Sequence, residues 1–231
     1  MAMKNLSLQS LIVLICLLLA ASSCKQRKPA AKPTKEQLHY LDYRKIFSAY
    51  KSAPLYYSKE MLDSFLLVYP TDSRAWAFYG RVKYDMNLPE EALVAYRNSI
   101  RFDSLFSEGY LGLGSVFNVL NNYDSAEFYL NKALLLNDSS AYTYLNLSML
   151  KMKKGEKANS FSLADSAYLY EDSSAVICSG LSYVYAQQKA RQKSAEMFER
   201  AVSLRLKDTA TFSQVLQGTV KIEDYYRKNK Y

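Results

Sequence analysis

The chain has 231 residues, 49% hydrophobic and 23% charged, so it can bury a core and does not have the composition of a disordered protein. With only 7 Gly and 5 Pro it is expected to be helical rather than all-β. Residues 1–35 hold 6 of the 30 Lys and Arg and no acid, which leaves 24 basic against 22 acidic side chains in a nearly neutral remainder and argues against nucleic-acid binding.

The first residues, MAMKNLSLQSLIVLICLLLAASSCKQ, have the order of a secretion signal. Lys4 supplies a positive charge, residues 11–21 form an apolar run that is short for a membrane span, and small residues precede Cys24. This order resembles a bacterial lipoprotein signal. The resemblance implies that residues 1–23 are a signal peptide and that Cys24 is acylated, palmitate included, which would hold the protein on a membrane. The alternatives are a cleaved signal with an incidental cysteine and a short uncleaved anchor.

Residues 24–38 are predicted to be a basic tether rich in Pro, Ala and Lys. They have no apolar periodicity, so we expect an extended linker that is drawn to anionic headgroups. Lys25 stands where Asp favours inner-membrane retention in enteric lipoproteins. By that analogy the expected location is the cell envelope, on the outer membrane facing the periplasm. Cys178 is then left alone, so no disulfide framework is expected and this thiol is predicted to be buried and inert.

The central part of the chain repeats with a period of thirty-four residues. ALLLNDSSAYTYLNLS at 133–148 and AYLYEDSSAVICSGLS at 167–182 agree at eight of sixteen positions. Counted from Ser73, successive units follow one another without insertion. The four units are residues 73–106, 107–140, 141–174 and 175–208.

Within each unit, large and small residues recur at fixed places. The second unit shows Tyr110, Leu113, Gly114 and Phe117 and then Ala126, Leu130 and Ala133. The first four stand at i, i+3, i+4 and i+7, which is one face of a helix. The pattern resembles the tetratricopeptide repeat, a helix–turn–helix unit of this length. The resemblance implies an all-α fold, a solenoid of helix pairs in a right-handed superhelix.

The turns and ends of the helices can also be predicted. Asp or Ser precedes each first helix as an N-cap, and Asn87 is expected to cap the second helix of the first unit, with Glu90 three residues on. Lys83 and Lys151 depart from the pattern, because an aromatic residue is expected there. Gly80 and Gly114, and Ser148 and Ser182 in the later units, are small where paired helices approach.

Two flanks complete the predicted solenoid. Residues 39–72 are predicted to be a degenerate repeat, because Pro70 falls at position thirty-two of the same register. Residues 209–231 are predicted to supply one capping helix, in which Phe212 and Val215 are in phase with the core.

No pattern in the sequence indicates catalysis. There is a single histidine, His39, with no cluster at metal-ligand spacing and no Gly-rich phosphate loop. We therefore expect that the protein is not an enzyme and holds no metal and no cofactor.

Tetratricopeptide arrays usually bind proteins or peptides in the groove lined by their first helices. By that resemblance the groove of this chain is mostly apolar, with a basic end, and suits a helix or an extended segment. The predicted groove residues are Arg74, Arg81, Tyr84, Leu111, Asn118, Tyr142, Leu145, Met149 and Tyr183. Alternatively, some of these pack between neighbouring helices or against the ends of the chain itself.

The resulting hypothesis is a membrane-anchored scaffold for protein–protein interaction in the bacterial cell envelope, in the assembly of an envelope machine. The alternative is a lipoprotein that binds a glycan or another small ligand, which the abundance of Tyr permits. The only Trp, Trp76, falls at a core position of its repeat and argues against that alternative. Partner, pathway and oligomeric state stay open.

Overall fold

The computed structural model describes residues 34–137 and 139–229, so the predicted signal peptide and Cys24 lie outside the described residues. The chain divides into two units, Met1–Tyr40 and Leu41–Tyr231. Only residues 34–40 of the first unit are described, and they include the first turns of helix α2. The described residues form twelve helices and no strand. Within this part of the chain, no helix has the length and apolar character needed to cross a membrane.

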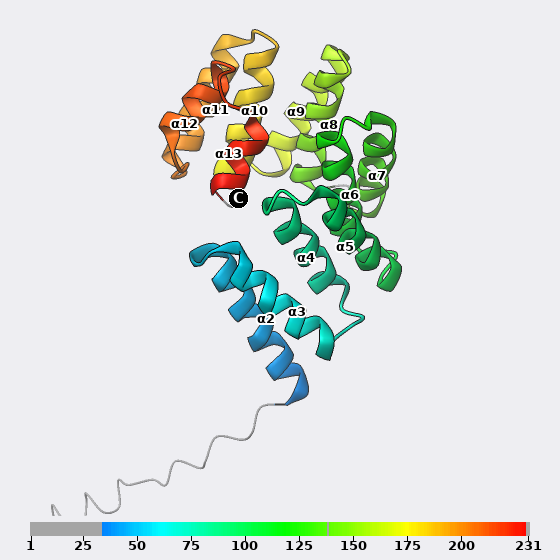
Figure 1. Ribbon diagram of the computed structural model, residues 1–231. Coiled ribbons are helices and arrows are strands. Elements are labelled where there is room, and N and C mark those ends of the chain that lie inside the picture. The colour runs from blue at the N-terminus through cyan, green and yellow to red at the C-terminus, as the bar shows by residue number, and fades with distance from the viewer. Residues whose placement is uncertain (1–33, 138, 230–231) are drawn as a thin grey trace, which may run out of the picture. The chain divides into compact units, whose positions relative to one another are not determined.

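The helices follow one another along the chain with short connections (Figure 1). Their bounds are α2 Lys35–Ser52, α3 Leu55–Val68, α4 Ser73–Asp85, α5 Pro89–Phe102, α6 Ser107–Val119, α7 Tyr123–Leu136, α8 Ala141–Lys153, α9 Lys157–Tyr170, α10 Ala175–Gln187, α11 Arg191–Ser203, α12 Thr209–Leu216 and α13 Ile222–Asn229.

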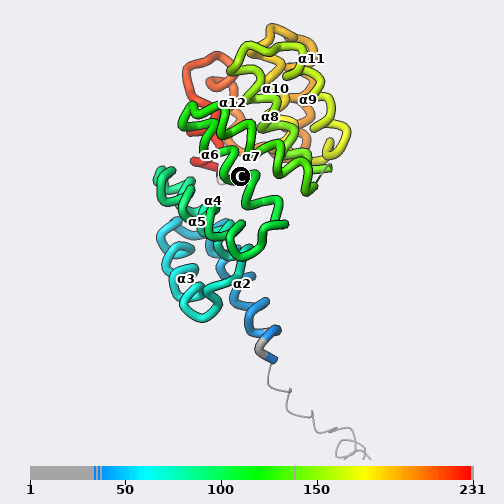
Figure 2. The backbone as a smooth tube through the Cα atoms, turned by 90° about the vertical axis from the view of Figure 1, so that its right-hand side faces the viewer, coloured from blue at the N-terminus to red at the C-terminus, as the bar shows by residue number. Residues whose placement is uncertain are grey.

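Helices from α4 to α11 pack in consecutive pairs. The pairs are α4 with α5, α6 with α7, α8 with α9 and α10 with α11, and each pair stacks on the next (Figure 2). The first helices of the pairs begin at Ser73, Ser107, Ala141 and Ala175, thirty-four residues apart. The predicted helix–turn–helix period is therefore confirmed.

Each pair turns at a residue with a left-handed backbone. These residues are Asn87, Asn121, Gly155 and Lys189, with φ of 64°, 59°, 80° and 63°. The next amide then bonds back to a carbonyl of the preceding helix, as Leu88 N does to Lys83 O at 3.0 Å. The prediction that Asn87 caps the following helix is therefore wrong. Helix α5 begins at Pro89 with no side-chain cap, because Asn tolerates the left-handed backbone that ends α4.

The predicted caps of the first helices hold in three of the four units. Asp72 accepts a hydrogen bond from Ala75 N at 2.8 Å, and Ser140 and Ser174 accept from the same position of α8 and α10. Helix α6 is the exception. Its N-cap position is Phe106, because Asp103 accepts from Leu105 N instead and forms a turn before the helix.

The flanking segments are helical as predicted, but the C-terminal one differs in detail. Phe212 and Val215 of α12 are fully buried, as their phase indicated. The prediction of one capping helix over 209–231 is wrong, because the segment forms the two short helices α12 and α13. Gly218, with φ of 79°, ends α12, and Thr219 N bonds back to Gln214 O at 3.0 Å.

Candidate functional site

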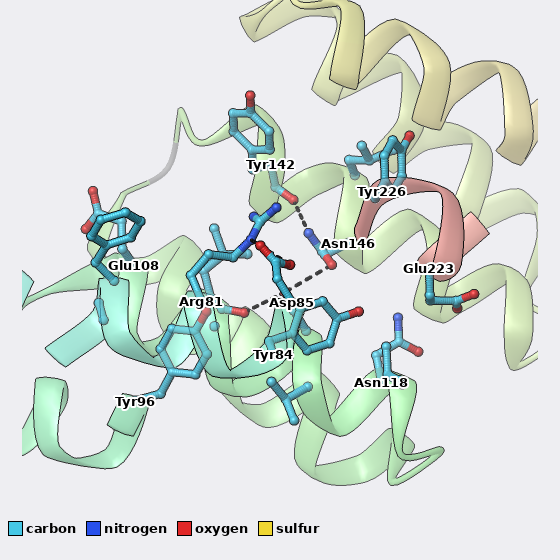
Figure 3. Close-up of a pocket in the computed structure, with 18 of the residues that line it drawn as sticks. Arg81, Tyr84, Asp85, Tyr96, Glu108, Asn118, Tyr142, Asn146, Glu223 and Tyr226 are labelled. Atoms are coloured by element: carbon cyan, nitrogen blue, oxygen red, sulfur yellow. Dashed lines mark hydrogen bonds and ion pairs between the residues drawn. The ribbon is translucent and has the colours of Figure 1, made fainter. Parts of the chain in front are cut away.

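A cavity of about 540 Å³ lies among the first helices of the repeats (Figure 3). We use the name groove for the surface formed by these first helices, α4, α6, α8 and α10. Most of the cavity wall comes from α4, α6 and α8, and α13 contributes Ile222, Glu223 and Tyr226. Eight of the nine predicted groove residues line the cavity, namely Arg74, Arg81, Tyr84, Leu111, Asn118, Tyr142, Leu145 and Met149.

An ion pair between the half-buried Arg81 and the buried Asp85 lies at the wall formed by α4. Arg81 Nε donates to both carboxylate oxygens of Asp85, at 3.2 and 3.1 Å, and Asp85 is only 4% exposed. The two residues stand one turn apart, so the helix itself brings them together. Tyr50 of α2 donates its hydroxyl to the same carboxylate at 2.5 Å.

Burial changes the titration of this cluster. It raises the pKa of the Asp85 carboxyl, against the opposing effect of the neighbouring Arg81 guanidinium. Burial also raises the pKa of the Tyr50 hydroxyl far above its usual range, so Tyr50 stays protonated and acts as the donor. The i, i+4 spacing of Arg81 and Asp85 in the sequence is typical of an ion pair on one helix. No nearby sequence feature predicts that Tyr50 bonds to Asp85.

Amide side chains form a polar strip of the cavity wall. Asn146 donates to Tyr142 O at 2.8 Å and accepts from the Ser115 hydroxyl at 3.1 Å, which joins α8 to α6. Asn118 is 5% exposed, and within the described part of the chain its Oδ1 has no hydrogen-bond partner. Asn118 was predicted from the sequence to line the groove. Asn146 was not, because its position in the repeat is not among the groove positions of the family pattern.

The apolar residues divide between core packing and open surface. Leu145 is 4% exposed and packs with Ile177 and Leu181 of α10, so it serves the stacking of repeats. Tyr142 is 45% exposed and stands open at the rim. Tyr84 is closed in by Arg227 of α13, whose guanidinium carbon lies 5.8 Å from the ring centroid, and burial raises the pKa of its hydroxyl to about 12.

The part of the groove formed by the last two repeats is covered by the C-terminal helix α13. Tyr226 of α13 pairs with the Ser179 hydroxyl at 3.0 Å, and Glu223 accepts from Lys153 at 3.2 Å. Tyr183, the ninth predicted groove residue, does not line the cavity. It packs instead beside Phe212 and Tyr225 in the C-terminal cluster.

Two further predictions concerned a reactive thiol and a metal site. Cys178 is fully buried, as predicted, and burial raises the pKa of its thiol, which keeps the thiol protonated. No group of three or more His, Cys, Asp and Glu side chains placed to hold a metal ion occurs in the residues that the structure describes.

Residues 107–140, the second predicted unit, match the family model of the tetratricopeptide repeat. The chain has the fold of a tetratricopeptide-repeat (TPR) solenoid. It is similar to a thermophilic TPR protein of Thermus thermophilus, with a TM-score of 0.69 and 17% identity over 78% of this chain and 98% of that one. Searching the curated proteins found no match.

Two further solved structures share the TPR solenoid. PilF of Pseudomonas aeruginosa matches with a TM-score of 0.61 and 12% identity, over 85% of this chain and 99% of that one. MamA of Desulfovibrio magneticus RS-1 matches with a TM-score of 0.54 and 12% identity, over 74% of this chain and 97% of that one. At these identities the likeness concerns the fold.

Proposed function

We propose that this TPR protein is a scaffold that binds a protein or peptide segment in its groove. The observation that carries the proposal is the cavity, whose wall is built by the first helices of three successive repeats and combines apolar, amide and charged side chains. A wall of this kind suits a peptide, because apolar side chains enter between Leu111 and Met149 while backbone groups meet amides such as Asn118.

We further propose that the scaffold acts in the bacterial cell envelope, in the assembly of an envelope machine, held on the outer membrane by lipid on Cys24. The support is the order of charge, apolar run and small residues before that cysteine. Replacing Cys24 with Ala should move the protein from the membrane to the soluble fraction of fractionated cells. Retention on the membrane after this change would refute the anchor and leave the groove proposal intact.

Photo-crosslinking in the native cell tests the scaffold function. The photoreactive residue replaces Arg74 or Tyr142, which line the cavity and are exposed, while Arg81 is left in place because it neutralises the buried Asp85. The matched control is Lys132, exposed on the second helix α7. We expect one protein to be captured from both cavity positions and not from Lys132. Equal capture from all three positions would contradict the proposal.

The second candidate is a glycan-binding or small-ligand-binding lipoprotein, which the hydroxyls of Tyr84, Tyr142 and Tyr226 in the cavity wall favour. Trp76, the residue best suited to stack on a sugar, is engaged elsewhere. Its Nε1 donates to Pro70 O at 2.7 Å and its ring stacks on Phe102. A rise in Tm with soluble cell-wall sugars, lost in Tyr142→Ala, would favour this candidate over the scaffold.

A further inference from the structure

Helix α13 lies on the groove as a ligand would. Its side chains reach the first helices of three repeats: Glu223 accepts from Lys153 of α8, and Arg227 lies over the ring of Tyr84 of α4. Tyr226 reaches α10, where it pairs with the Ser179 hydroxyl and donates to Val176 O at 3.3 Å. Figure 3 shows this helix beside the cavity, with Tyr226 and Glu223 at its edge.

An adjoining side of α13 packs on the end of the solenoid. Ile222 and Tyr225 are buried with Phe212 and Val215 of α12. The helix has eight residues, which is too short for stability in isolation, so it depends on these two sets of contacts. Ile222 and Tyr225 therefore hold the helix to α12. Glu223, Tyr226 and Arg227 make the contacts that a bound partner would make.

The connection between α12 and α13 is an exposed turn at Gly218. Residues 217–219 are exposed, Gly218 has a φ of 79°, and nothing lies within 4 Å of the place where its Cβ would stand. Phe212 and Val215 of α12 share their buried cluster with Cys178 and Ala201 of the last repeat as well as with Ile222 and Tyr225 of α13. Local opening of a terminal helix at such a connection requires less free energy than opening of the whole domain.

We propose that the groove of the last two repeats binds a short partner helix in which an acidic residue stands three positions before a tyrosine, and that α13 is an internal copy of this ligand which the partner displaces. The inference rests on the proposed scaffold function and names the partner class for that site. The groove recognises the carboxylate with Lys153 and the tyrosine hydroxyl with Ser179 and the Val176 carbonyl. Because α13 competes with the partner, the apparent affinity for the partner decreases as the fraction of chains with α13 bound in the groove increases.

Hydrogen exchange on the full chain tests whether α13 opens. Amides of residues 225–229 should exchange at least tenfold faster, after correction for intrinsic rates, than core amides of α8 and α10. Exchange of α13 only together with the core amides would show that the helix is a fixed part of the fold and would overturn the displacement.

A charge swap tests the recognition. The probe is a fluorescent peptide of residues 219–229, TVKIEDYYRKN, used as it stands or with Glu223→Lys. In the full chain carrying Lys153→Glu the native α13 is repelled, so the Glu223→Lys peptide should bind about fivefold more tightly than the unchanged peptide. A full chain with Lys132→Glu carries the same charge change on exposed α7 and should show no such preference.

Equal binding of the two peptides to the Lys153→Glu chain would overturn the proposed recognition. The scaffold function itself would still be tested separately, because capture from Arg74 and Tyr142 in the cell uses neither the peptide nor the Lys153→Glu change. Capture of a partner together with equal peptide binding would keep the scaffold and reject this ligand class. The reverse result would keep the peptide-binding groove and reject the cellular scaffold.

Discussion

Ser148 and Ser160 each donate a side-chain hydrogen bond to the other's backbone carbonyl, at 2.8 and 2.9 Å, across the interface of α8 and α9. Ser182 and Ser194 do the same in the next repeat, both at 2.9 Å. The first two repeats have Gly and Ala at these positions. The small residues predicted where paired helices approach therefore act in two ways. Gly and Ala leave room for the facing helix, and Ser forms hydrogen bonds to its backbone.

Ser160→Ala should lower the free energy of unfolding by about 1–2 kcal/mol. The change removes the bond to Ser148 O and leaves the half-buried Gln188 amide, which donates to the Ser160 hydroxyl at 2.8 Å, without its acceptor. Urea denaturation measures the effect. Ser162→Ala on the exposed side of α9 is the control, and an equal effect of the two changes would contradict the role of the serine pair.

The left-handed turn positions predict opposite effects of two substitutions. Lys189 has a side chain at a φ of 63°, so Lys189→Gly should raise stability by about 1 kcal/mol by relieving the strain of that backbone. Gly155→Ala, at a φ of 80°, should lower stability by a similar amount. Thermal unfolding measures both changes in stability. A decrease in Tm for Lys189→Gly would contradict this account.

Arg81→Met should lower the free energy of unfolding by about 3 kcal/mol, because it leaves the buried Asp85 carboxylate without its cation. The double variant Arg81→Met, Asp85→Leu should regain most of this loss, since no buried charge is left unpaired. A double-mutant cycle in urea measures the coupling. Losses that simply add would show that the two side chains act independently.

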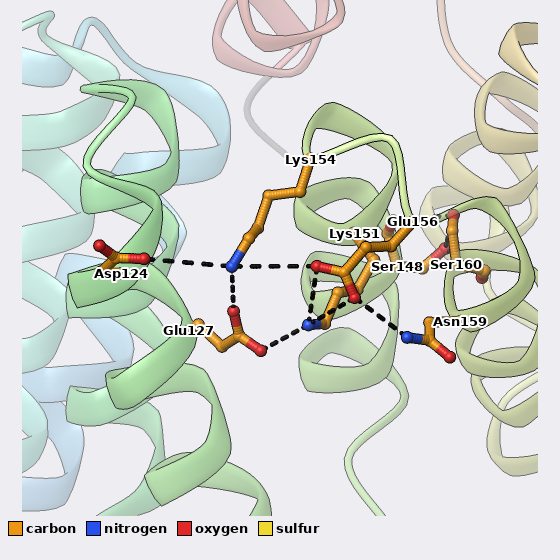
Figure 4. A network of polar contacts seen from close by, with 8 residues as sticks. All are labelled: Asp124, Glu127, Ser148, Lys151, Lys154, Glu156, Asn159 and Ser160. Atoms are coloured by element: carbon orange, nitrogen blue, oxygen red, sulfur yellow. Dashed lines mark hydrogen bonds and ion pairs between the residues drawn. The ribbon is translucent and has the colours of Figure 1, made fainter.

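The ion pairs between α7 and α8 should make stability depend on pH (Figure 4). Hydrogen bonds from Lys151 at 2.5 Å and Lys154 at 2.6 Å hold the pKa of Glu127 below its usual value of 4.5. A carboxyl with a lowered folded-state pKa stabilises the protein above its unfolded-state pKa, and this stabilisation is lost as pH falls through the folded-state pKa.

Glu127→Gln should therefore cost stability at pH 7, by no more than about 1 kcal/mol for so accessible a cluster, and cost less at pH 3. Urea unfolding at both pH values, with the exposed Glu199→Gln as control, measures the difference. A cost that stays the same at both pH values would rule out the ion pairs as its cause.

The same cluster explains why two lysines stand where the repeat pattern expects aromatic residues. Lys151 binds Glu127 and Glu156, and the buried Lys83 binds Glu91 at 2.6 Å with its ammonium 5.0 Å from the ring centroid of Tyr79. In both repeats an ion pair takes the place of aromatic packing. The departures were visible in the sequence, but their acidic partners, on a neighbouring helix or beyond a turn, were not.

The sequence by itself determined the repeat period, the helix pairs and most of the residues that line the cavity. These follow from local rules, since a thirty-four-residue spacing places the same helix face in each unit and a left-handed residue ends each first helix. Only the tertiary structure decided that Tyr50 bonds Asp85, thirty-five residues away, and that α13 folds back on Ser179 and Lys153. Such contacts depend on how successive repeats stack and on the path of the chain after Gly218, and neither leaves a periodic trace in the sequence.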